Sequence, residues 1–589
     1  MRVKAGVRVN RLYFGDNLDV LREHVGDESV DLVYLDPPFN SKRDYNLLFK
    51  SPKGHQSDAQ ITAFEDSWSW GPQAEREFGE LLAQPNTEVT KMMVSLREFL
   101  GENDMMAYLT MMANRLLELH RVLKPTGSLY LHCDPTASHY LKVVLDGVFG
   151  KTLYRSEINW RRSSAHNDAK QGRRQYGNVR DVIFFYSKSD TWTWNWLYTP
   201  YTPEYLESEY HHRTTGGRYF KETDLTANKP GGDVSYEWRV KRAPGQRWEA
   251  DLTDEFKLPQ PSMEYAGVTP YQGRYWAYSR QNLIDFANAG KLQHRATGMP
   301  RLIQFADEMP GVPLQNDWQD ILPASGAEHL GYDTQKPIAL LERIINASSN
   351  PGDVVLDPFC GCGTAVYAAQ KLARRWIGID ITHLSIALVE QRLKNAFPYL
   401  NATSGAPAPT VVPSYMLNFN VLGTPQDLDG ARDLATRDKY QFQWWACSLV
   451  NARPHKGKKK GADSGIDGLI FFQDDKGPAK KIVVSVKGGA SVGVPMVRDL
   501  VGVLDREKAA IGLFVTLAEP TGPMVKEAVK AGYYTSPVTG AQFPRLQILT
   551  IHDLLAGTGP AYPDLARGGH TFKKAVRDQG AAEQGEIFG

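Results

Sequence analysis

The chain of 589 residues is 42% hydrophobic and 23% charged, an ordinary globular composition, and its length exceeds a single hydrophobic core. Its net charge of +1 excludes a generally basic protein, so contacts with nucleic acid would require locally concentrated positive charge. Four cysteines in a chain of this length do not indicate a disulfide framework, which favours a reducing cytoplasm. Because no apolar stretch is long enough, we expect neither a signal peptide nor a membrane span.

Strands and helices alternate in the first part of the chain. Apolar stretches predict strands at residues 30–36, 127–134 and 181–187, and amphipathic periodicity predicts helices at 105–123 and 139–149. Such alternation is typical of a parallel sheet that is covered by helices. The sequence therefore predicts an α/β fold.

This pattern is interrupted once and restarted once. A stretch rich in Trp, Tyr, Arg and Gly lacks the alternation and indicates an inserted domain, and a later stretch rich in Pro, Ala and Ser indicates a linker. The expected boundaries are 1–190 for the first α/β part, 191–315 for the insert, 316–400 for the second α/β part, 401–430 for the linker, 431–567 for a smaller α/β unit and 568–589 for a polar tail.

The stretch "DVVLDPFCGCGTAVYAAQKLARRWIGID" predicts a cofactor loop. A strand ends at Asp357, a turn holds Gly361 and Gly363, a helix follows, and the next strand ends at Asp380. Glycines let the backbone approach a ligand, and an acid at the end of the next strand can accept hydrogen bonds from ribose hydroxyls. The acid at 357 would repel a pyrophosphate and attract a cation, which favours S-adenosylmethionine. A tight turn with a satisfied strand-end acid is the alternative.

A second loop follows the strand at residues 30–36. It reads Asp36-Pro37-Pro38-Phe39, an acid, two prolines and an aromatic ring. The prolines preset two φ angles, so acceptors on this loop need little reorganisation, and a ring face suits stacking against a flat ligand. The alternative is an ordinary turn at the end of a strand.

Cys360 and Cys362 have no second Cys/His pair nearby, so we interpret them as small loop residues and not as metal ligands.

Together these motifs resemble the β class of amino-group DNA methyltransferases. In order they are "GDNLDVL" with Asp16, "DPPF", the insert, "TQKP" with Lys336 and "DPFCGCGT". The resemblance implies a Rossmann-like methyltransferase fold with permuted motif order and an inserted target-recognition domain. It also implies a set of cofactor-binding residues, namely Asp16, Lys336, Asp357, Phe359, Gly361, Gly363, Thr364 and Asp380, and a set of catalytic residues, namely Asp36, Pro37, Pro38 and Phe39.

The resemblance further implies the chemistry. Asp36 and the Pro37 carbonyl would accept the two hydrogens of an exocyclic amine on a base flipped out of double-stranded DNA, and Phe39 would stack on that base. Asp at the first position favours adenine N6, and cytosine N4 is the alternative. The sequence contains no Pro-Cys pair suited to attack on cytosine C5. A DNA-binding regulator with a decayed fold would not need these intact loops.

Some positions depart from the family pattern. Phe39 replaces the commoner Tyr, Asp380 replaces a frequent Glu, and Asp333 stands where His-Pro often precedes "TQKP".

Arginines among the aromatic residues of the insert, and the basic stretch 160–180, predict contacts with DNA. No base-reading residue follows from the sequence. Members of the family are often dimers, and the sequence leaves a homodimer open.

The C-terminal unit resembles the Mrr-like branch of the PD-(D/E)xK nucleases, through "GADSGIDGLIFFQDDKGPAKKIVVSVKGG". The resemblance implies that Asp467 is the metal-binding acid, with Mg²⁺ as the metal, and that Lys487 is the lysine of the site. Ser485 stands where the family has Glu or Gln, and a hydroxyl is a poorer Mg²⁺ ligand than a carboxylate. A unit that cleaves DNA and a unit that only binds it through the lysines at 456–460 both remain open.

Overall fold

The computed structural model describes residues 9–38, 44–50, 56–65, 69–85, 87–163, 174, 176–228, 236–252, 260–326, 328–330, 332, 334–400, 413–455, 465–474 and 479–563. The chain divides into two compact units, of which the smaller comprises Trp196–Gln315 and the larger comprises the remainder. Within the described part, no helix is both long and apolar enough to cross a membrane.

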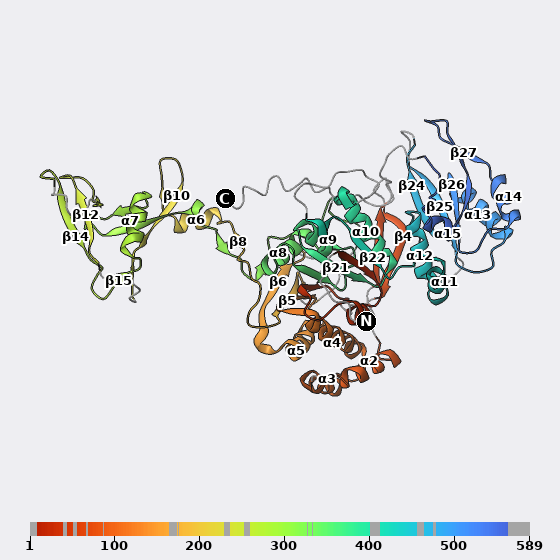
Figure 1. Cartoon of the computed structure of the whole chain (residues 1–589), viewed down its shortest axis with the longest axis horizontal. Coiled ribbons are helices and arrows are strands. Elements are labelled where there is room, and N and C mark those ends of the chain that lie inside the picture. The colour runs from red at the N-terminus through yellow and green to blue at the C-terminus, as the bar shows by residue number, and fades with distance from the viewer. Residues whose placement is uncertain are drawn as a thin grey trace. The chain divides into compact units, whose positions relative to one another are not determined.

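A nine-stranded sheet forms the centre of the larger unit (Figure 1). In spatial order its strands are β19 (Asp317–Trp318), β6 (Tyr154–Arg161), β7 (Arg180–Ser187), β5 (Leu123–Cys133), β2 (Val30–Leu35), β20 (Val354–Asp357), β21 (Arg375–Asp380), β1 (Asn10–Phe14) and β22 (Phe419–Leu422). From β5 to β22 all neighbours are parallel, whereas β7 runs antiparallel to both β5 and β6. The predicted α/β fold is confirmed.

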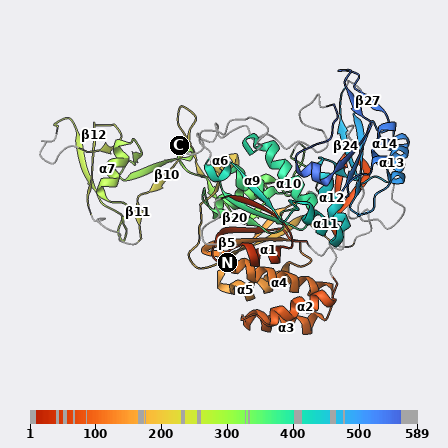
Figure 2. The same cartoon turned by 45° about the vertical axis from the view of Figure 1, so that its right-hand side comes forward.

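Helices cover both faces of this sheet (Figure 2). On one face lie α1 (Asn17–His24), α4 (Asp104–Val122) and α5 (Ser138–Phe149), and on the other lie α8 (Ile338–Ser348), α9 (Thr364–Lys371) and α10 (His383–Ala396). All six residues of β2 are buried, as a strand covered on both sides requires. Residues 419–422, within the linker expected from the sequence, form the edge strand β22.

Two further helices were not expected from the sequence. They are α2 (Pro72–Leu82) and α3 (Thr87–Leu100), which pack against α4 and α5. Phe78 and Leu81 of α2 are buried in the main core, so this segment is part of the domain and not a surface loop. An antiparallel pair, β3 (Asp44–Lys50) and β4 (Gln56–Glu65), precedes them along the chain.

The topology brings four acids to one edge of the sheet. Strands β2, β20, β21 and β1 are consecutive neighbours and run parallel, so their carboxyl ends lie at the same edge. Each of these strands ends at or just before an acid, in spatial order Asp36, Asp357, Asp380 and Asp16. In open α/β sheets ligands bind in the crevice outside the carboxyl ends of the strands.

The smaller unit is built from short antiparallel strands. Its sheets contain β16 (Leu292–His294), β17 (Pro300–Phe305), β10 (Tyr219–Asp224) and β9 (His212–Arg213); β13 (Glu249–Ala250), β12 (Trp238–Arg242) and β14 (Glu264–Val268); β11 (Thr226–Ala227) and β15 (Tyr275–Trp276); and β8 (Tyr198–Thr199) and β18 (Val312–Pro313). Two helices accompany them, α6 (Pro203–Glu209) and α7 (Arg280–Asn288). Its core holds Trp238, Trp276 and Leu283.

The C-terminal residues of the larger unit form a second sheet. Its strands are, in spatial order, β23 (Arg453–Pro454), β24 (Gly468–Phe472), β25 (Lys480–Lys487), β26 (Ile511–Thr516) and β29 (Leu546–Thr550), with a separate pair of β27 (Tyr533–Thr535) and β28 (Gln542–Pro544). The helices here are α11 (Leu428–Arg437), α12 (Lys439–Leu449), α13 (Val494–Glu507), α14 (Gly522–Lys530) and α15 (Ile551–Leu555).

Candidate active site

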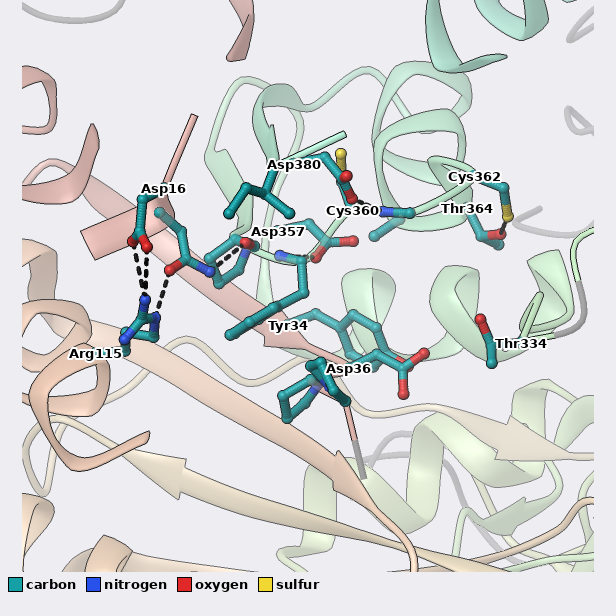
Figure 3. A pocket seen from close by; sticks show the side chains of 18 of the residues that line it. Asp16, Tyr34, Asp36, Arg115, Thr334, Asp357, Cys360, Cys362, Thr364 and Asp380 are labelled. Carbon is teal, nitrogen blue, oxygen red and sulfur yellow. Dashed lines mark hydrogen bonds and ion pairs between the residues drawn. The ribbon is translucent and has the colours of Figure 1, made fainter. Parts of the chain in front are cut away.

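A cavity of about 270 Å³ opens at the edge of the sheet where the acids gather (Figure 3). Asp357 lies between Asp380 and Asp36, as the order of their strands requires. Of the described residues that the sequence assigned to catalysis or to the cofactor, those that line this cavity are Asp16, Asp36, Pro37, Pro38, Lys336, Asp357, Phe359, Gly361, Thr364 and Asp380. Gly363 does not line it, and Phe39 lies outside the described residues.

Asp36 is held by one oxygen only. Lys336 donates from Nζ to Asp36 Oδ2 at 2.5 Å, and both side chains are largely buried, with 9% and 17% of their surfaces exposed respectively. Asp36 Oδ1 is buried and accepts no hydrogen bond from any residue that the structure describes. A buried carboxylate oxygen without a donor is costly, and it is suited to accept a hydrogen from a ligand. The structure thus pairs Lys336 with Asp36, and because Lys336 also lines the cavity, its assignment to the cofactor stays a prediction.

Asp357 ends β20 inside the cavity. It is 4% exposed, and its Oδ1 accepts a hydrogen bond from the Phe359 backbone N–H at 3.1 Å. Burial, followed by the negative charges of Asp36 and Asp380, raises the pKa of Asp357 well above its ordinary value, against the hydrogen bond and the positive charge of Lys336. A positively charged ligand placed here would relieve that penalty.

The glycine-rich turn leads from β20 into α9. Gly361 and Gly363 have φ values of +49° and +75°, in the left-handed region that favours glycine. A Cβ added to Gly363 would lie 2.7 Å from a methyl carbon of Val389, so this position needs a glycine for packing as well. Thr364 opens α9, and the buried guanidinium of Arg392 donates to its hydroxyl at 3.2 Å and to the carbonyl of Cys362 at 2.9 Å.

Asp380 fixes this turn from the neighbouring strand. Its Oδ2 accepts from the Gly361 N–H at 2.9 Å, and its Oδ1 accepts from the backbone and the hydroxyl of Thr382, both at 2.9 Å. Burial raises the pKa of Asp380 although these hydrogen bonds lower it. Carboxylate oxygens have further lone pairs, so Asp380 can still accept hydrogen bonds from the hydroxyls of a ribose.

Asp16 begins α1 and pairs with an arginine that the sequence did not single out. Its Oδ1 caps the helix by accepting from the Leu18 N–H at 2.8 Å, and Arg115 donates to both of its oxygens at 2.9 and 3.0 Å. Arg115 also donates to Asn17 at 2.6 Å, and Asn17 donates to the Pro358 carbonyl at 2.8 Å. This network ties β1 to the loop after β20. Asp16 thus stabilises the cavity wall, and its assignment to the cofactor stays a prediction.

Sequence reasoning also missed other residues of the lining. They include Tyr34, Gln73, Glu77, Tyr332 and Ile381. For Tyr34 a signal existed, because it precedes Asp36 by two residues on one strand and so lies on the same side of it. Gln73 and Glu77 come from α2, one turn apart, and no motif marks that helix.

In the C-terminal sheet, Asp467 lies beside Ser485 and Lys487. Its Oδ2 accepts from the Val486 N–H at 2.6 Å and lies 3.4 Å from the Ser485 hydroxyl and 4.0 Å from Lys487 Nζ, while Gln443 donates to its Oδ1 at 3.1 Å. Among the residues that the structure describes, no three His, Cys, Asp or Glu side chains come together as a metal site. One carboxylate with a serine, a glutamine and a lysine is a donor set that does not fit Mg²⁺ well.

With this geometry established, comparison with known proteins is informative. The sequence model of a family described as "DNA methylase" matches residues 30–391, well over half of the 589 residues. The chain belongs to the DNA methylase family. A second model, described as "Restriction endonuclease", matches residues 434–543. Both resemblances inferred from the motifs are therefore confirmed, and this DNA methylase carries an Mrr-like domain after its methylase part.

Several curated proteins are similar to this DNA methylase. The "Type II methyltransferase M.EcaI" of Enterobacter cloacae is 30% identical over 49% of this chain and 57% of its own length. The "Type III restriction-modification enzyme StyLTI Mod subunit" of Salmonella typhimurium is 24% identical over 62% of this chain and 50% of its own. The "DNA adenine methyltransferase YhdJ" of Escherichia coli is 50% identical over 12% of this chain and 24% of its own. The chain thus spans about half the length of the first two.

Proposed function

We propose that this chain transfers the methyl group of S-adenosylmethionine to N6 of adenine in double-stranded DNA, on a base flipped out of the helix. The observation that carries the proposal is Asp36 Oδ1, a buried oxygen in a cavity lined by acids, to which none of the residues described in the structure donates a hydrogen bond. An exocyclic amine supplies the missing donor. The relative named as a DNA adenine methyltransferase supports adenine as the base.

The cavity lining fits S-adenosylmethionine. Asp380 offers acceptors for the ribose hydroxyls, and the buried carboxyl of Asp357 lies where a cationic group is favoured. The backbone of the turn from Phe359 to Thr364 lies against the cavity, and Gly361 in this turn has no Cβ that would narrow it. When bound, this cofactor supplies an electrophilic methyl group on its sulfonium.

The residues of the chain orient the amine for attack. The lone pair of a base amine is delocalised into the ring, so the nitrogen is a poor nucleophile until its hydrogens are pulled out of the ring plane. Asp36 Oδ1 accepts one of these hydrogens, and the carbonyl of Pro37 accepts the other. Lys336, by holding Asp36 Oδ2, fixes which oxygen faces the base. Pre-placed acceptors of this kind act without reorganisation at the moment of reaction. Phe39 supplies the stacking face for the flipped base.

The base is tested by analysis of the product. Plasmid DNA incubated with the purified chain and S-adenosylmethionine is digested to nucleosides and examined by mass spectrometry. We expect N6-methyladenine, and Asp36→Asn should abolish it, since that change replaces one acceptor oxygen with a donor. N4-methylcytosine as the product would assign the chain to the alternative. Unmethylated DNA with the wild-type chain would contradict the proposal as a whole.

We propose that the insert contacts the DNA, although several of its arginines are already engaged. Arg218 pairs with Asp307, Arg239 with Asp251 and Arg242 with Glu264. Aromatic side chains such as Trp196 and Tyr271 are exposed on the insert, and exposed rings of this kind can stack on bases or wedge between them. Replacing Trp196 with Ala should lower the affinity for a duplex that carries the methylated site, as measured by fluorescence anisotropy, and leave cofactor binding unchanged. Equal affinity for that duplex would exclude Trp196 from the interface.

For the Mrr-like domain we propose a role in DNA binding and, in view of its relatives' names, in restriction-modification. The contacts of Asp467 support binding over efficient cleavage, because both of its oxygens already accept hydrogen bonds and Ser485 adds no charge. Plasmid nicking with Mg²⁺ by the wild type, Asp467→Ala and Ser485→Glu decides between them. Binding alone predicts no cleavage by any form. Cleavage by the wild type that Asp467→Ala abolishes and Ser485→Glu strengthens would establish a nuclease.

A further inference from the structure

A chain of buried titratable side chains runs away from the cavity through three neighbouring strands. Tyr34 on β2 is bonded through its hydroxyl to His132 Nδ1 on β5 at 3.0 Å, and His132 Nε2 lies 3.2 Å from Asp181 Oδ2 on β7. All three are nearly inaccessible, with exposures of 2%, 0% and 2%. Burying three such groups in one sheet is costly, which calls for an explanation beyond packing.

The two ends of this chain differ. At the inner end Tyr34 lines the cavity, two residues before Asp36, and Figure 3 shows the two as neighbours. At the outer end Asp181 Oδ1 lies 3.3 Å from Arg162, whose side chain is partly exposed. Burial raises the pKa of Asp181, but its hydrogen bond to His132 and the positive charges of Lys336 and Arg162 lower it below its ordinary value overall. Asp181 is therefore a carboxylate.

The proposed reaction leaves a proton to be removed. When a base amine forms a bond to the methyl carbon, the carbon–sulfur bond breaks and its electron pair returns to sulfur. The nitrogen then carries a positive charge and one hydrogen too many. Asp36 is the nearest acceptor, but its other oxygen is ion-paired with Lys336, and a proton left on it would block the next turnover.

Resting on the methyl transfer proposed above, we infer that Tyr34, His132 and Asp181 form the route by which this proton leaves the site. The Tyr34 oxygen accepts the proton from the amine, directly or from Asp36, and the Tyr34 hydroxyl proton passes to His132 Nδ1. His132 becomes an imidazolium that faces the Asp181 carboxylate. When product is released, the proton on His132 Nδ1 returns to the Tyr34 oxygen as the Tyr34 hydroxyl proton passes to water in the emptied cavity, which restores neutral His132 and Tyr34. General-base assistance of this type contributes about 10²–10⁴-fold to rates.

Charged groups from several elements surround the two partners of His132. Those that act on Tyr34 or lie close enough to interact with Asp181 are Asp36, Asp357, Asp134, Arg162 and Lys336. In direct contact are the Tyr34 hydroxyl and the Asp181 carboxylate, and the edge of the Trp160 ring packs at 5.7 Å between centroids. A carboxylate at one nitrogen and a hydroxyl at the other match the donor–base–orienter arrangement of proton-transfer sites.

The test is the methyl-transfer rate in a single turnover, measured across pH at saturating cofactor and DNA. For the wild type we expect a rate that depends on pH, because the relay takes up a proton in each turnover. Tyr34→Phe should lower the rate by about 10²–10⁴-fold and remove that dependence. Asp181→Asn should alter the dependence, because the imidazolium formed in the step loses its counter-charge. A network that only holds the strands together would not move the profile.

A matched control is Tyr130→Phe. Tyr130 is on β5, is 1% exposed and loses an equally buried hydrogen bond, to Ser348 at 2.7 Å, but does not line the cavity. It should keep the wild-type rate and pH profile. Folding is checked by thermal melting and cofactor affinity by calorimetry, and if Tyr34→Phe does not fold, His132→Asn replaces it, with the same loss of pH dependence expected.

The outcomes separate this inference from the proposed function. A wild-type rate and profile in Tyr34→Phe or His132→Asn would overturn the relay while leaving methylation intact. Full activity of Asp36→Ala would instead overturn the catalytic site itself. Activity lost in Asp36→Ala with unchanged profiles in both relay variants would assign proton removal to Asp36 and solvent alone.

Discussion

At the scale of single residues, the pairing of Lys336 with Asp36 suggests a second role for this lysine. The resemblance placed Lys336 among the cofactor-binding residues, whereas its Nζ donates to Asp36, which the resemblance placed among the catalytic residues. The two roles predict different kinetics. Lys336→Gln removes the charge and frees the Asp36 rotamer, so we expect kcat to fall by about 10–100-fold, since a misplaced acceptor no longer aligns the amine.

The same variant should leave the affinity for S-adenosylmethionine within about twofold, which calorimetry measures. Lys371→Gln provides a control, because Lys371 pairs with Glu342 on the surface of the same half of the molecule. That variant should match the wild type in both quantities. A large loss of cofactor affinity in Lys336→Gln with kcat unchanged would restore the original assignment.

A second residue-scale prediction concerns pH. Burial and neighbouring negative charges raise the pKa of Asp357, so in the empty cavity its carboxyl holds a proton above the usual pKa of about 3.9. The cationic cofactor favours the ionised form, so binding releases that proton. The affinity for S-adenosylmethionine should therefore rise with pH up to the raised pKa and then level off. Calorimetry in buffers of different ionisation enthalpy measures the proton release.

The raised pKa of Asp357 also predicts how the stability of the folded chain depends on pH. A carboxyl with a raised folded-state pKa binds its proton more tightly in the folded chain, so the empty protein loses stability as pH rises through this window. Asp357→Asn should flatten both dependences, because an amide does not titrate. An affinity that falls with rising pH in the wild type would contradict the assignment of Asp357 to the cationic part of the cofactor.

At the scale of elements, the turn between β20 and α9 depends on glycine for two separate reasons. Gly363 has φ +75°, and a Cβ there would meet Val389 of α10 at 2.7 Å. Gly363→Ala should therefore lower the free energy of unfolding by about 1–3 kcal/mol and weaken cofactor binding, since the turn must shift to relieve the contact.

The control for this change is Gly502→Ala in α13. Gly502 is helical and exposed, and an added Cβ meets nothing within 4 Å. Alanine there should stabilise the chain by up to about 1 kcal/mol, because a helix interior favours Ala over Gly. Chemical denaturation and calorimetry on both variants provide the measurement. If Gly363→Ala left the free energy of unfolding unchanged, α9 and α10 would separate more easily than their packing indicates.

At the scale of the whole molecule, the Mrr-like domain packs against the glycine-rich turn between β20 and α9. Trp444 of α12 is 5% exposed and packs with Tyr332, Cys362, Leu384 and Leu388. From the same helix, Gln441 accepts from the His383 N–H at 3.2 Å. Since Tyr332 and Cys362 also line the cavity, removing this support should loosen it.

Trp444→Ala should therefore reduce the affinity for S-adenosylmethionine several-fold and lower stability by about 3–5 kcal/mol. Trp445→Ala is the matched control, because Trp445 is the next residue on α12 and is buried in the core of the Mrr-like domain instead. It should cost similar stability without a change in cofactor affinity. Calorimetry at a temperature where both variants are folded distinguishes the two. If both variants lost the same affinity for S-adenosylmethionine, the loss would come from general destabilisation and not from the contact of Trp444 with the cavity wall.

The sequence by itself determined the fold class, the order of the motifs and the positions of the strand-end acids. These are local properties: a buried strand that ends in Asp36 or Asp357, and glycines at the positions of positive φ, are visible in short stretches of sequence. The motifs were sufficient to identify the methylase family and the Mrr-like unit.

Only the tertiary structure decided which distant side chains meet. Lys336 and Asp36 are 300 residues apart, and Arg115 and Asp16 are 99 apart, so no periodicity or motif pairs them. Tyr34, His132 and Asp181 meet because β2, β5 and β7 are neighbours in the sheet, and strand order is a property of the packed core. Local sequence selects strands and turns, whereas the pairing of side chains across strands depends on how the whole sheet assembles.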